Sequence, residues 1–294
     1  MINLYYSTLC RKLGLVKTTD WGIAIRRVSN GYDTILSNKG EGNVFEVIEN
    51  IPNYWFADPL LFSENEKTWL FVEAFNINEH KGELGVFDII DGKATNFRLI
   101  VKTPTHMSYP FVFKHRNEYY MIPETGAAKE IVLYKAEIFP DVWKREKILL
   151  SGEIFRDSTI IRLRDNSLKI LSYKQTGTNR FDMKYFVTVF DLDMDNKCLI
   201  QIEQFIDKKK INRPAGPLLN YDNILYRVSQ KCDRVYGESI YVFKTDSSFS
   251  FKNDHIVNQL RGEDIKLDNG SKPILVHTYS QSGGYEVIDY RCLK

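Results

Sequence analysis

The chain has 294 residues, a formal net charge of +2, 43% hydrophobic residues and 27% charged residues. This composition is ordinary for a globular protein with a sizeable core, and the near-neutral charge argues against a dedicated nucleic-acid surface. We therefore expect no nucleic-acid partner. The four cysteines, Cys10, Cys198, Cys232 and Cys292, lack the spacing of a zinc knuckle or a redox motif, so we expect reduced structural thiols.

The sequence also bears on where the protein acts. Residues 1–17 contain basic side chains but no apolar core of signal-peptide length. No stretch approaches the roughly 20 apolar residues that a membrane-spanning helix needs. We expect no membrane span and a cytoplasmic location.

The first 53 residues are the least regular part of the chain. Residues 21–28 and 43–48 are strand candidates, and residues 29–41 between them are rich in Gly, Asn, Ser and Asp, which are typical of turns. A repeating pattern begins after this segment.

The repeat is clearest in its first two copies. Asp58-Pro59 opens a strand, a polar turn at 63–67 follows, and further strands are expected at 68–75, 83–90 and 96–101. The second copy has strands at 109–113, 118–125 and 130–136. Asp58 precedes Glu73 by 15 residues, and Tyr109 precedes Glu124 by the same 15 residues. This shared offset indicates two copies of one structural unit.

Three further copies follow with weaker similarity. The third has strands at 157–161, 168–173 and 185–190, and the fourth has them at 213–217, 224–229 and 239–244. The fifth opens near Gly262-Glu263-Asp264 and continues at 274–279 and 285–291. Repeats of about 40 to 50 residues, each with four short strands, are typical of propeller blades.

The pattern predicts an all-β fold, a five-bladed β-propeller that forms a single domain over residues 1–294. Residues 1–53 are the closing segment, and the blades span about 54–104, 105–153, 154–210, 211–258 and 259–294. The strand at 21–28 would complete the last blade, which otherwise runs out of chain, and this would leave no open sheet edge. A β-sandwich with additions is the alternative fold.

In a propeller, residues that open the innermost strands gather at one mouth of the central channel. We expect convergence there of Asp58, Tyr109, Asp157, Arg213 and either Glu263 or Asp264. The ends of the second strands would add Glu73, Glu124 and His277. Neighbouring acids can divide the roles of general acid and base, as in hydrolysis of a glycosidic bond, or accept hydrogen bonds from sugar hydroxyls.

Each candidate has a role if the site is catalytic. Asp58 would be the base or would orient the nucleophile, Asp157 or Glu124 would donate the proton, and Arg213 would steady a negative charge. Tyr109 would offer a stacking surface. Glu73, Glu238 and His277 complete the expected substrate-binding set, with Glu238 at the rim.

Structural roles are open for the same residues. Asp58-Pro59 is also a plausible turn, and Glu73 and Glu124 could be paired structural acids. Arg213 could only neutralise an inner acid, His277 could be a core histidine, and Glu238 could be a turn residue.

The sequence contains no pattern for a metal or a cofactor. Its five histidines, residues 80, 106, 115, 255 and 277, show no ligand spacing. No Walker or Rossmann motif is present, so we expect no metal and no cofactor, although a sugar nucleotide could bind by other means.

The motifs at 56–59, 109–111 and 119–124 resemble those of five-bladed propellers of the glycoside hydrolase family 43 type. Together with Arg213-Pro214-Ala215-Gly216, they are more similar to the propeller domain at the N-terminus of plant glucosamine inositolphosphorylceramide transferases and of bacterial surface-polysaccharide proteins. The resemblance covers about residues 53–291. In the hydrolases, the three catalytic positions are a base, an acid that tunes pKa, and a glutamic acid donor. Asp58 matches the first, whereas Tyr109 and Asp157 stand at the other two.

The resemblance implies a carbohydrate-active protein that transfers or hydrolyses glycosidic bonds during assembly of a surface polysaccharide or glycolipid. Its substrate would be a carbohydrate or a sugar nucleotide, and a partner transferase could act with it. The alternative is a non-catalytic propeller module that binds a sugar or a partner through the same mouth.

Overall fold

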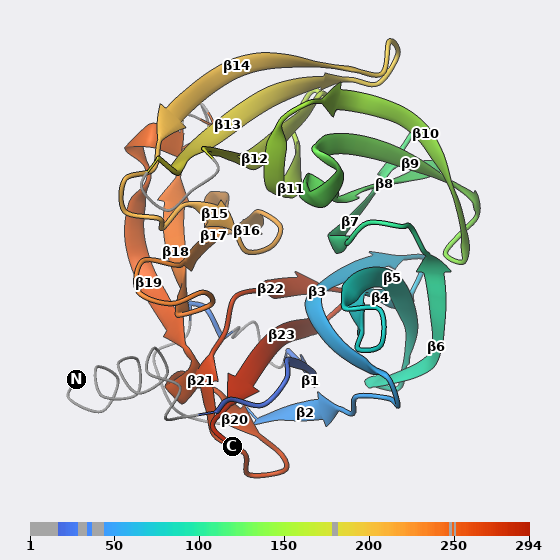
Figure 1. Ribbon diagram of the computed structural model, residues 1–294, viewed down its shortest axis with the longest axis vertical. Helices are drawn as coiled ribbons and strands as arrows, with labels where there is room; N and C mark the ends of the chain where they lie inside the picture. The colour runs from blue at the N-terminus through green and yellow to red at the C-terminus, as the bar shows by residue number, and fades with distance from the viewer. Residues whose placement is uncertain (1–16, 29–33, 37–43, 178–181, 247–248, 250) are drawn as a thin grey trace.

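The computed structural model describes residues 17–28, 34–36, 44–177, 182–246, 249 and 251–294. Five sheets are arranged around a common centre, and the strands of each sheet are ordered from the inside to the outside of the ring (Figure 1). The predicted five-bladed β-propeller is confirmed. Cys10 and most of the turn-rich segment at 29–41 lie outside the described residues.

The first blade follows the predicted repeat. Its strands, from inside to outside, are β3 (Tyr54–Glu64), β4 (Lys67–Asn76), β5 (Lys81–Ile90) and β6 (Lys93–Val101). Asn65 and Glu66 connect β3 to β4 as a two-residue hairpin with φ of 49° and 64°. Positive φ at both positions is the geometry that matches the twist of the flanking strands.

The second and third blades have the same antiparallel order. The second contains β7 (Ser108–His115), β8 (Glu118–Glu124), β9 (Glu130–Ile138) and β10 (Val142–Ser151), with the 3-10 turn η1 (Gly126–Ala128) after β8. The third contains β11 (Ile154–Arg162), β12 (Leu168–Thr176), β13 (Lys184–Asp193) and β14 (Cys198–Ile206).

The innermost strands of these three blades share one irregularity. Each has a bulge at the residue that opens the predicted repeat: Asp58 and Tyr109 have φ of 47°, and Asp157 has φ of 43°. A bulge leaves residues unpaired and turns the local backbone. In this propeller, the bulged residues of all three inner strands are buried.

The innermost strand of the fourth blade is broken into two short pieces. The blade contains β15 (Arg213–Pro214), β16 (Leu219–Tyr221), β17 (Ile224–Lys231), β18 (Ser239–Thr245) and β19 (His255–Arg261), with η2 (Phe251–Asn253) before β19. The break contains Gly216, where a Cβ atom would lie 1.8 Å from the carbonyl oxygen of Tyr279 in the next blade. Only glycine allows the two backbones to approach so closely.

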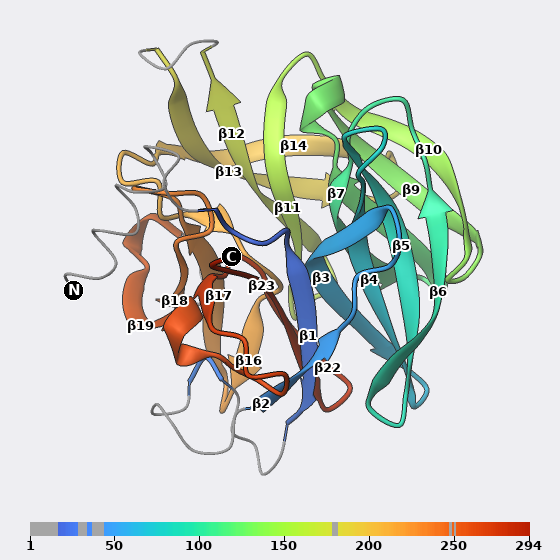
Figure 2. The same cartoon turned by 60° about the horizontal axis from the view of Figure 1, so that its bottom comes forward.

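The fifth blade joins the two ends of the chain. Its main strands are β22 (Tyr279–Ser282), β23 (Tyr285–Cys292), β1 (Gly22–Arg27) and β2 (Val44–Ile48), with short additions β20 (Lys266–Leu267) and β21 (Pro273–Leu275). Figures 1 and 2 show β1 beside β23, and their register runs from Gly22 opposite Tyr290 to Arg27 opposite Tyr285. The prediction that residues 21–28 complete the last blade is confirmed, and β2 adds a further strand to it.

The predicted opening of the fifth blade is wrong. Glu263 and Asp264 belong to the 3-10 turn η3 (Gly262–Asp264), where the Asp264 carboxylate accepts a hydrogen bond from the backbone of Arg261. The inner strand β22 begins at Tyr279, so the residues that correspond to a blade opening are those just before it. His277 and Thr278 take the place that Glu263 and Asp264 were expected to fill.

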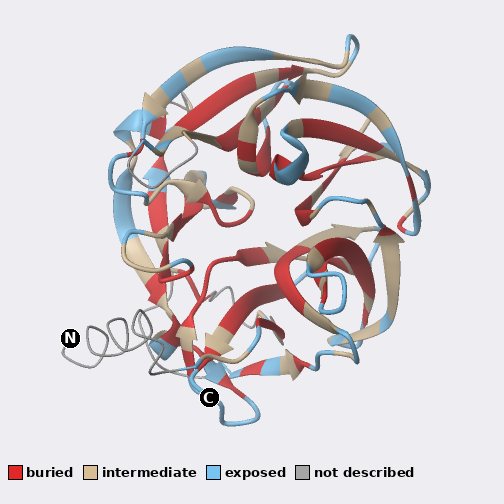
Figure 3. Cartoon of the chain, viewed as in Figure 1, coloured by how far each residue is buried: buried red, intermediate tan, exposed pale blue. Residues whose placement is uncertain are grey.

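Apolar side chains fill the spaces between neighbouring blades. One cluster joins Phe56, Leu70 and Val72 of the first blade to Ile25 and Val287 of the fifth. Figure 3 shows that burial is concentrated on the inner strands, while the outermost strands of the first four blades, β6, β10, β14 and β19, are mostly intermediate or exposed. The inner strands are therefore the most closely packed part of the molecule, and this packing can hold the side chains of a site in fixed positions.

The helices of the described ranges are short 3-10 turns, and none of them has the length or the apolar character needed to cross a membrane.

Candidate functional site

A cavity of about 250 Å³ receives side chains from all five blades. Its lining is Trp21, Trp55, Ala57, Asp58, Glu73, Phe75, His106, Ser108, Glu124, Arg156, Arg213, Tyr236 and His277. The bulged starts of the inner strands and the ends of the second strands supply most of these positions, as expected for one mouth of a propeller.

The structure brings five of the eight predicted site residues together in this cavity: Asp58, Glu73, Glu124, Arg213 and His277. The other three, Tyr109, Asp157 and Glu238, do not line it.

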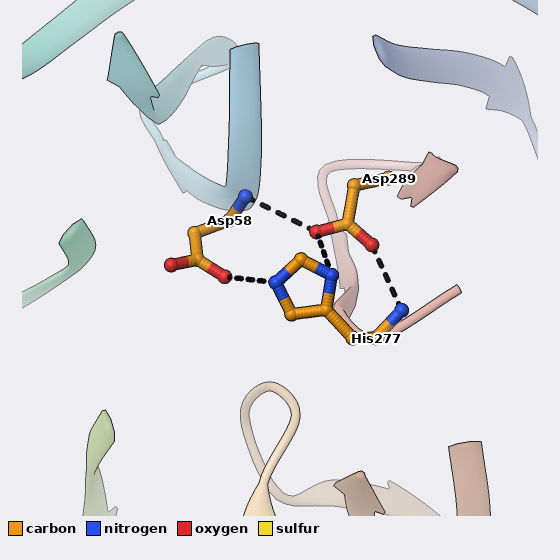
Figure 4. Close-up of side chains that lie close together, drawn as sticks. All are labelled: Asp58, His277 and Asp289. Carbon is orange, nitrogen blue, oxygen red and sulfur yellow. Dashed lines mark hydrogen bonds and ion pairs between the residues drawn. The ribbon is translucent and has the colours of Figure 1, made fainter. Parts of the chain in front are cut away.

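His277 lies between two carboxylates (Figure 4). Its Nε2 is 3.1 Å from Asp58 Oδ1, and its Nδ1 is 3.0 Å from Asp289 Oδ2. Asp289 Oδ1 also accepts the backbone N–H groups of His277 and Thr278, each at 2.9 Å, and Oδ2 accepts that of Asp58 at 3.2 Å. The Thr278 hydroxyl donates to Asp58 Oδ1 at 2.9 Å. These contacts fix the first and fifth blades against each other.

This arrangement favours a charged imidazole between two ionised acids. Burial lowers the pKa of His277, but Asp289 and Asp58 outweigh that effect and raise the pKa to about 10. Burial raises the pKa of Asp58, but His277 is stronger and lowers that pKa to about 2. Asp58 therefore stays ionised across the physiological range. His277 is buried, each of its ring nitrogens faces a carboxylate, and the residue also lines the cavity.

The same three residues form the one acid and histidine group, among the described residues, that is compact enough to hold an ion. Their ligand atoms lie within 4.8 Å of one another. Each ring nitrogen of His277 already faces a carboxylate oxygen, so the imidazole has no free lone pair to offer. We assign no metal to this group.

Arg213 connects the third and fourth blades. Its guanidinium binds Asp157 through Nε and Nη2, at 2.5 Å and 3.1 Å, and its Nη2 lies 3.7 Å from Glu124 Oε2. Gln230 Nε2 donates to Asp157 Oδ2 at 2.8 Å. Asp157 is fully buried, and both of its oxygens are bound. Asp157 positions Arg213 in this structure, and the predicted direct proton donation from Asp157 to a ligand is not supported by its location.

Glu124 lines the cavity but is held by cations. Arg156 Nη1 donates to Glu124 Oε1 at 2.8 Å, and the Gly126 backbone N–H donates to the same oxygen at 3.1 Å. With Arg213 near its other oxygen, Glu124 is surrounded by donors. Such an acid is suited to accept hydrogen bonds and orient the arginines.

Tyr109 and Glu238 lie away from the cavity surface. Tyr109 is fully buried, its hydroxyl pairs with that of Thr159 at 2.8 Å, and its backbone N–H donates to Asp58 Oδ2 at 3.2 Å. The expectation that Tyr109 is a stacking surface is therefore wrong. Glu238 accepts hydrogen bonds from Lys231 at 2.7 Å and from Arg234.

Glu73 has a different environment from the other cavity acids. It is 6% exposed, and its Oε1 lies 3.6 Å from His106 Nε2. The Gly82 N–H donates to His106 Nδ1 at 2.8 Å, which places the proton of a neutral imidazole on Nε2. Burial, and then the charge of Asp58, raises the pKa of Glu73 well above its ordinary value. Burial lowers the pKa of His106.

Aromatic rings flank these polar groups. Trp55 and Phe75 stack with ring centroids 4.3 Å apart and planes inclined by 8°. Trp21 and Tyr236 pack against the imidazole of His277, with centroid distances of 4.2 Å and 4.9 Å. A cavity that combines flat apolar rings with hydrogen-bonding acids matches the two kinds of surface that a sugar ring presents.

Sequence reasoning missed several residues of the site, namely Trp21, Trp55, Phe75, His106, Arg156, Tyr236 and Asp289. The alternation of side chains along a strand would have identified Phe75. It lies two residues after Glu73 on β4, so the two side chains share a face, and Glu73 was already a candidate. Asp289 stands out as an acid within the apolar run of β23. Trp55 and His106 share an offset three residues before Asp58 and Tyr109, and the remaining residues come from strand ends and loops.

The fold and this cavity define a class: a five-bladed β-propeller with an acid-lined central cavity. Residues 45–265 match the family described as "Glucosamine inositolphosphorylceramide transferase 1, N-terminal", and the chain belongs to this family.

Two plant relatives illustrate the match. The chain is 29% identical over 202 residues to glucosamine inositolphosphorylceramide transferase 1 of Oryza sativa subsp. indica, covering 66% of this chain and 27% of the relative. It is 29% identical over 204 residues to the protein of that name from Arabidopsis thaliana, covering 67% and 26%. The chain thus spans about a quarter of the length of these relatives.

Solved structures share the fold at low sequence identity. A thermostable family-43 glycoside hydrolase superposes with a TM-score of 0.60 at 11% identity, covering 83% of this chain and 90% of that one. The GH43_1 enzyme from Xanthomonas citri complexed with xylose gives a TM-score of 0.57 at 9% identity, covering 83% and 88%. At these identities, the likeness establishes the fold.

Proposed function

We propose that this chain binds a carbohydrate in the five-blade cavity and processes a glycosidic bond there, by transfer or by hydrolysis. The observation that carries this proposal is the pairing of two unlike carboxyl groups in one cavity. Asp58 has a pKa of about 2, while the pKa of Glu73 is raised well above its ordinary value. Acids with diverging pKa values can serve as base and acid at one pH.

The lining supports a sugar as the ligand. Trp55, Phe75 and Tyr236 provide flat apolar surface, and Asp58 and Glu124 provide acceptors for hydroxyl groups. Charged groups of both signs line the cavity: the acids Asp58 and Glu124, and the cations Arg156, Arg213 and His277. A sugar would therefore meet both hydrogen-bond acceptors and donors there.

The relatives suggest the biological setting. Because they are named for glucosamine and inositolphosphorylceramide, we include amino sugars and glycolipids among the proposed substrates and place the activity in assembly of a surface polysaccharide or glycolipid. The chain covers only a part of those proteins. A partner transferase acting with this propeller and a cytoplasmic location belong to the same proposal, and affinity capture and cell fractionation test them.

A non-catalytic sugar-binding module is the second candidate. It is favoured by a specific observation: the residues at the second and third catalytic positions of the hydrolase pattern, Tyr109 and Asp157, are fully buried and do not line the cavity. In this alternative, the cavity would present a sugar or bind a partner without breaking a bond.

One experiment separates the two candidates. Binding and turnover are measured with glycosides, oligosaccharides and sugar nucleotides for the wild type, Asp58→Asn and Glu124→Gln. If the site is catalytic, Asp58→Asn retains measurable binding and loses turnover. Binding by the wild type without turnover of any substrate supports the module, and absence of both binding and turnover contradicts a carbohydrate site.

A further inference from the structure

The acids of the cavity differ in their partners. Asp58 faces the imidazole of His277, and Glu124 faces Arg156 and Arg213. Glu73 forms no ion pair with a lysine or arginine in the ranges that the structure describes, although it is almost fully buried and lines the cavity. An acid without a cationic partner in such a place is strongly disfavoured in its ionised form.

The surroundings of Glu73 strengthen this preference. The titratable and charged groups around it come from every neighbouring blade: Asp58 on β3, His106 before β7, Glu124 on β8, Arg156 on β11, Arg213 on β15, His277 before β22 and Asp289 on β23. The two arginines are engaged by Glu124 and Asp157. His277 is likewise engaged by Asp58 and Asp289.

His106 supplies orientation rather than charge. Its Nδ1 is occupied by the N–H of Gly82, so its Nε2–H is directed toward the Glu73 carboxyl group. A neutral donor at this place can fix the carboxyl group while leaving its proton in place. The backbone enforces the contact, because a Cβ atom at Gly82 would lie 2.6 Å from Glu73 Oε1.

We propose that Glu73 donates a proton to the glycosidic oxygen of a bound substrate, and that His106 is the residue that positions it. This inference rests on the proposed function and narrows its substrate class to glycosides with an alcohol leaving group. A sugar nucleotide leaves as a phosphate and needs no such donor. Glu73 thereby takes the role that the sequence suggested for Asp157 or Glu124.

In the proposed step, one proton moves from Glu73 to the leaving group and another moves from the nucleophile to Asp58. The O–H bond of Glu73 breaks as the bond between the anomeric carbon and the glycosidic oxygen breaks. The bonding electron pair stays with that oxygen, which takes the proton and departs as an alcohol. A water molecule or an acceptor hydroxyl forms the new bond to the anomeric carbon and gives its proton to Asp58. Proton exchange with solvent restores Glu73 and Asp58.

The first test reads the proton of Glu73 directly. Carbon-13 NMR of glutamate carboxyl groups is followed from pH 4 to pH 9 in the wild type and in Glu73→Gln, which assigns the signal. We expect the Glu73 signal to titrate well above the ordinary value for glutamate, about 4.3. Titration near that ordinary value overturns the proposal. This readout needs no substrate, so it is independent of the proposed function.

The second test measures turnover with aryl and alkyl glycosides of graded leaving-group acidity. We expect Glu73→Gln to lose roughly 10²- to 10⁴-fold in turnover of alkyl glycosides and much less with the most acidic phenol leaving groups, because a good leaving group needs no proton. An equal loss with every leaving group contradicts proton donation. If Glu73 holds its proton but the wild type turns over no glycoside, both the donor role and the catalytic form of the proposed function fail.

A control variant and a test of His106 complete the experiment. Glu83→Gln changes another buried glutamate that accepts the Tyr54 hydroxyl at 2.9 Å and does not line the cavity, and we expect it to leave the leaving-group dependence unchanged. At high pH, where Glu73 ionises, the N–H of His106 stabilises the ionised carboxylate. His106→Leu removes this N–H and should raise the pKa of Glu73, so we expect the alkaline limb of the pH profile to move to higher pH. An unmoved limb contradicts the positioning role of His106.

Discussion

His277 is the residue whose charge most depends on the fold around it. In an unfolded chain its pKa would be about 6.5, whereas Asp289 and Asp58 raise the pKa to about 10 in the folded protein against the opposing effect of burial. A raised histidine pKa contributes stability that is fully present below the unfolded value. That contribution is lost as the pH rises through the folded value.

We therefore predict that His277→Gln destabilises the protein by roughly 3 to 5 kcal/mol near pH 6, the range for breaking a buried ion pair. The difference from the wild type should shrink steadily between pH 7 and pH 10. Chemical denaturation at pH 6, 8 and 10 measures it. A difference that stays constant over this range would mean that His277 is neutral in the folded protein.

Some of the individual residues of the site could be predicted from the sequence, and others could not. Asp58, Glu73 and Glu124 were predictable because the repeat gives them fixed offsets within a blade. The absence of Tyr109 and Asp157 from the cavity was not predictable, because Asp58 occupies the equivalent bulged position with nearly the same φ and does line it. Trp55 and His106 stand at one repeat offset, three residues before Asp58 and Tyr109, and were missed because their side chains differ in type.

At the scale of the element, β5 controls the cavity through a glycine. A Cβ atom at Gly82 would lie 2.2 Å from the carbonyl oxygen of Met107 and 2.6 Å from Glu73 Oε1. The absence of a side chain at this place lets the segment before β7 approach β5 and brings His106 to Glu73. The close contact between two blades is thus a condition for the site.

We predict that Gly82→Ala costs about 1 to 3 kcal/mol of stability, as overpacking commonly does, and displaces His106 from Glu73. Thermal unfolding and the NMR titration of Glu73 measure the two effects. Gly85→Ala is the matched control on the same strand, because its nearest neighbours are atoms of the Phe97 ring. If Gly82→Ala leaves the Glu73 titration unchanged, the contact with His106 does not depend on this glycine.

Strand prediction succeeded where the strands repeat and failed where the blades deviate. The strands predicted for the first three blades correspond to β3 to β9 and β11 to β13, whereas the outermost strands β10 and β14 were not predicted. The fifth blade deviates because β20, β21 and η3 interrupt its approach to the centre. Gly262-Glu263-Asp264 has the composition of a blade opening, but long-range pairing with β2 and β23 places that segment elsewhere.

At the scale of the whole molecule, the ring depends on the pairing of β1 with β23. Ile25 on β1 is 1% exposed and packs in the cluster that joins the fifth blade to the first. This strand joins residues more than 250 positions apart, so its loss would remove packing between the fifth and first blades and leave β23 unpaired on one side. The strands β22 and β23 also contact β3 directly, which brings His277 to Asp58.

We predict that Ile25→Ala destabilises the protein by about 2 to 5 kcal/mol, the cost of a large-to-small change in a core. Thermal unfolding should remain a single transition, since the blades share their cores. Ile200→Ala on the outermost strand β14, where the residue is 55% exposed, should change stability by no more than about 0.5 kcal/mol. Equal effects of the two substitutions would contradict a closure that depends on β1.

The most direct measurement is a crystal structure of the chain grown with glycosides and amino sugars. We predict a sugar ring in the five-blade cavity, with a flat face against Trp55 or Tyr236 and oxygen atoms within hydrogen-bonding distance of Asp58 and Glu73. A sugar bound only outside this cavity, or none bound at concentrations that saturate carbohydrate-binding proteins, would contradict the account.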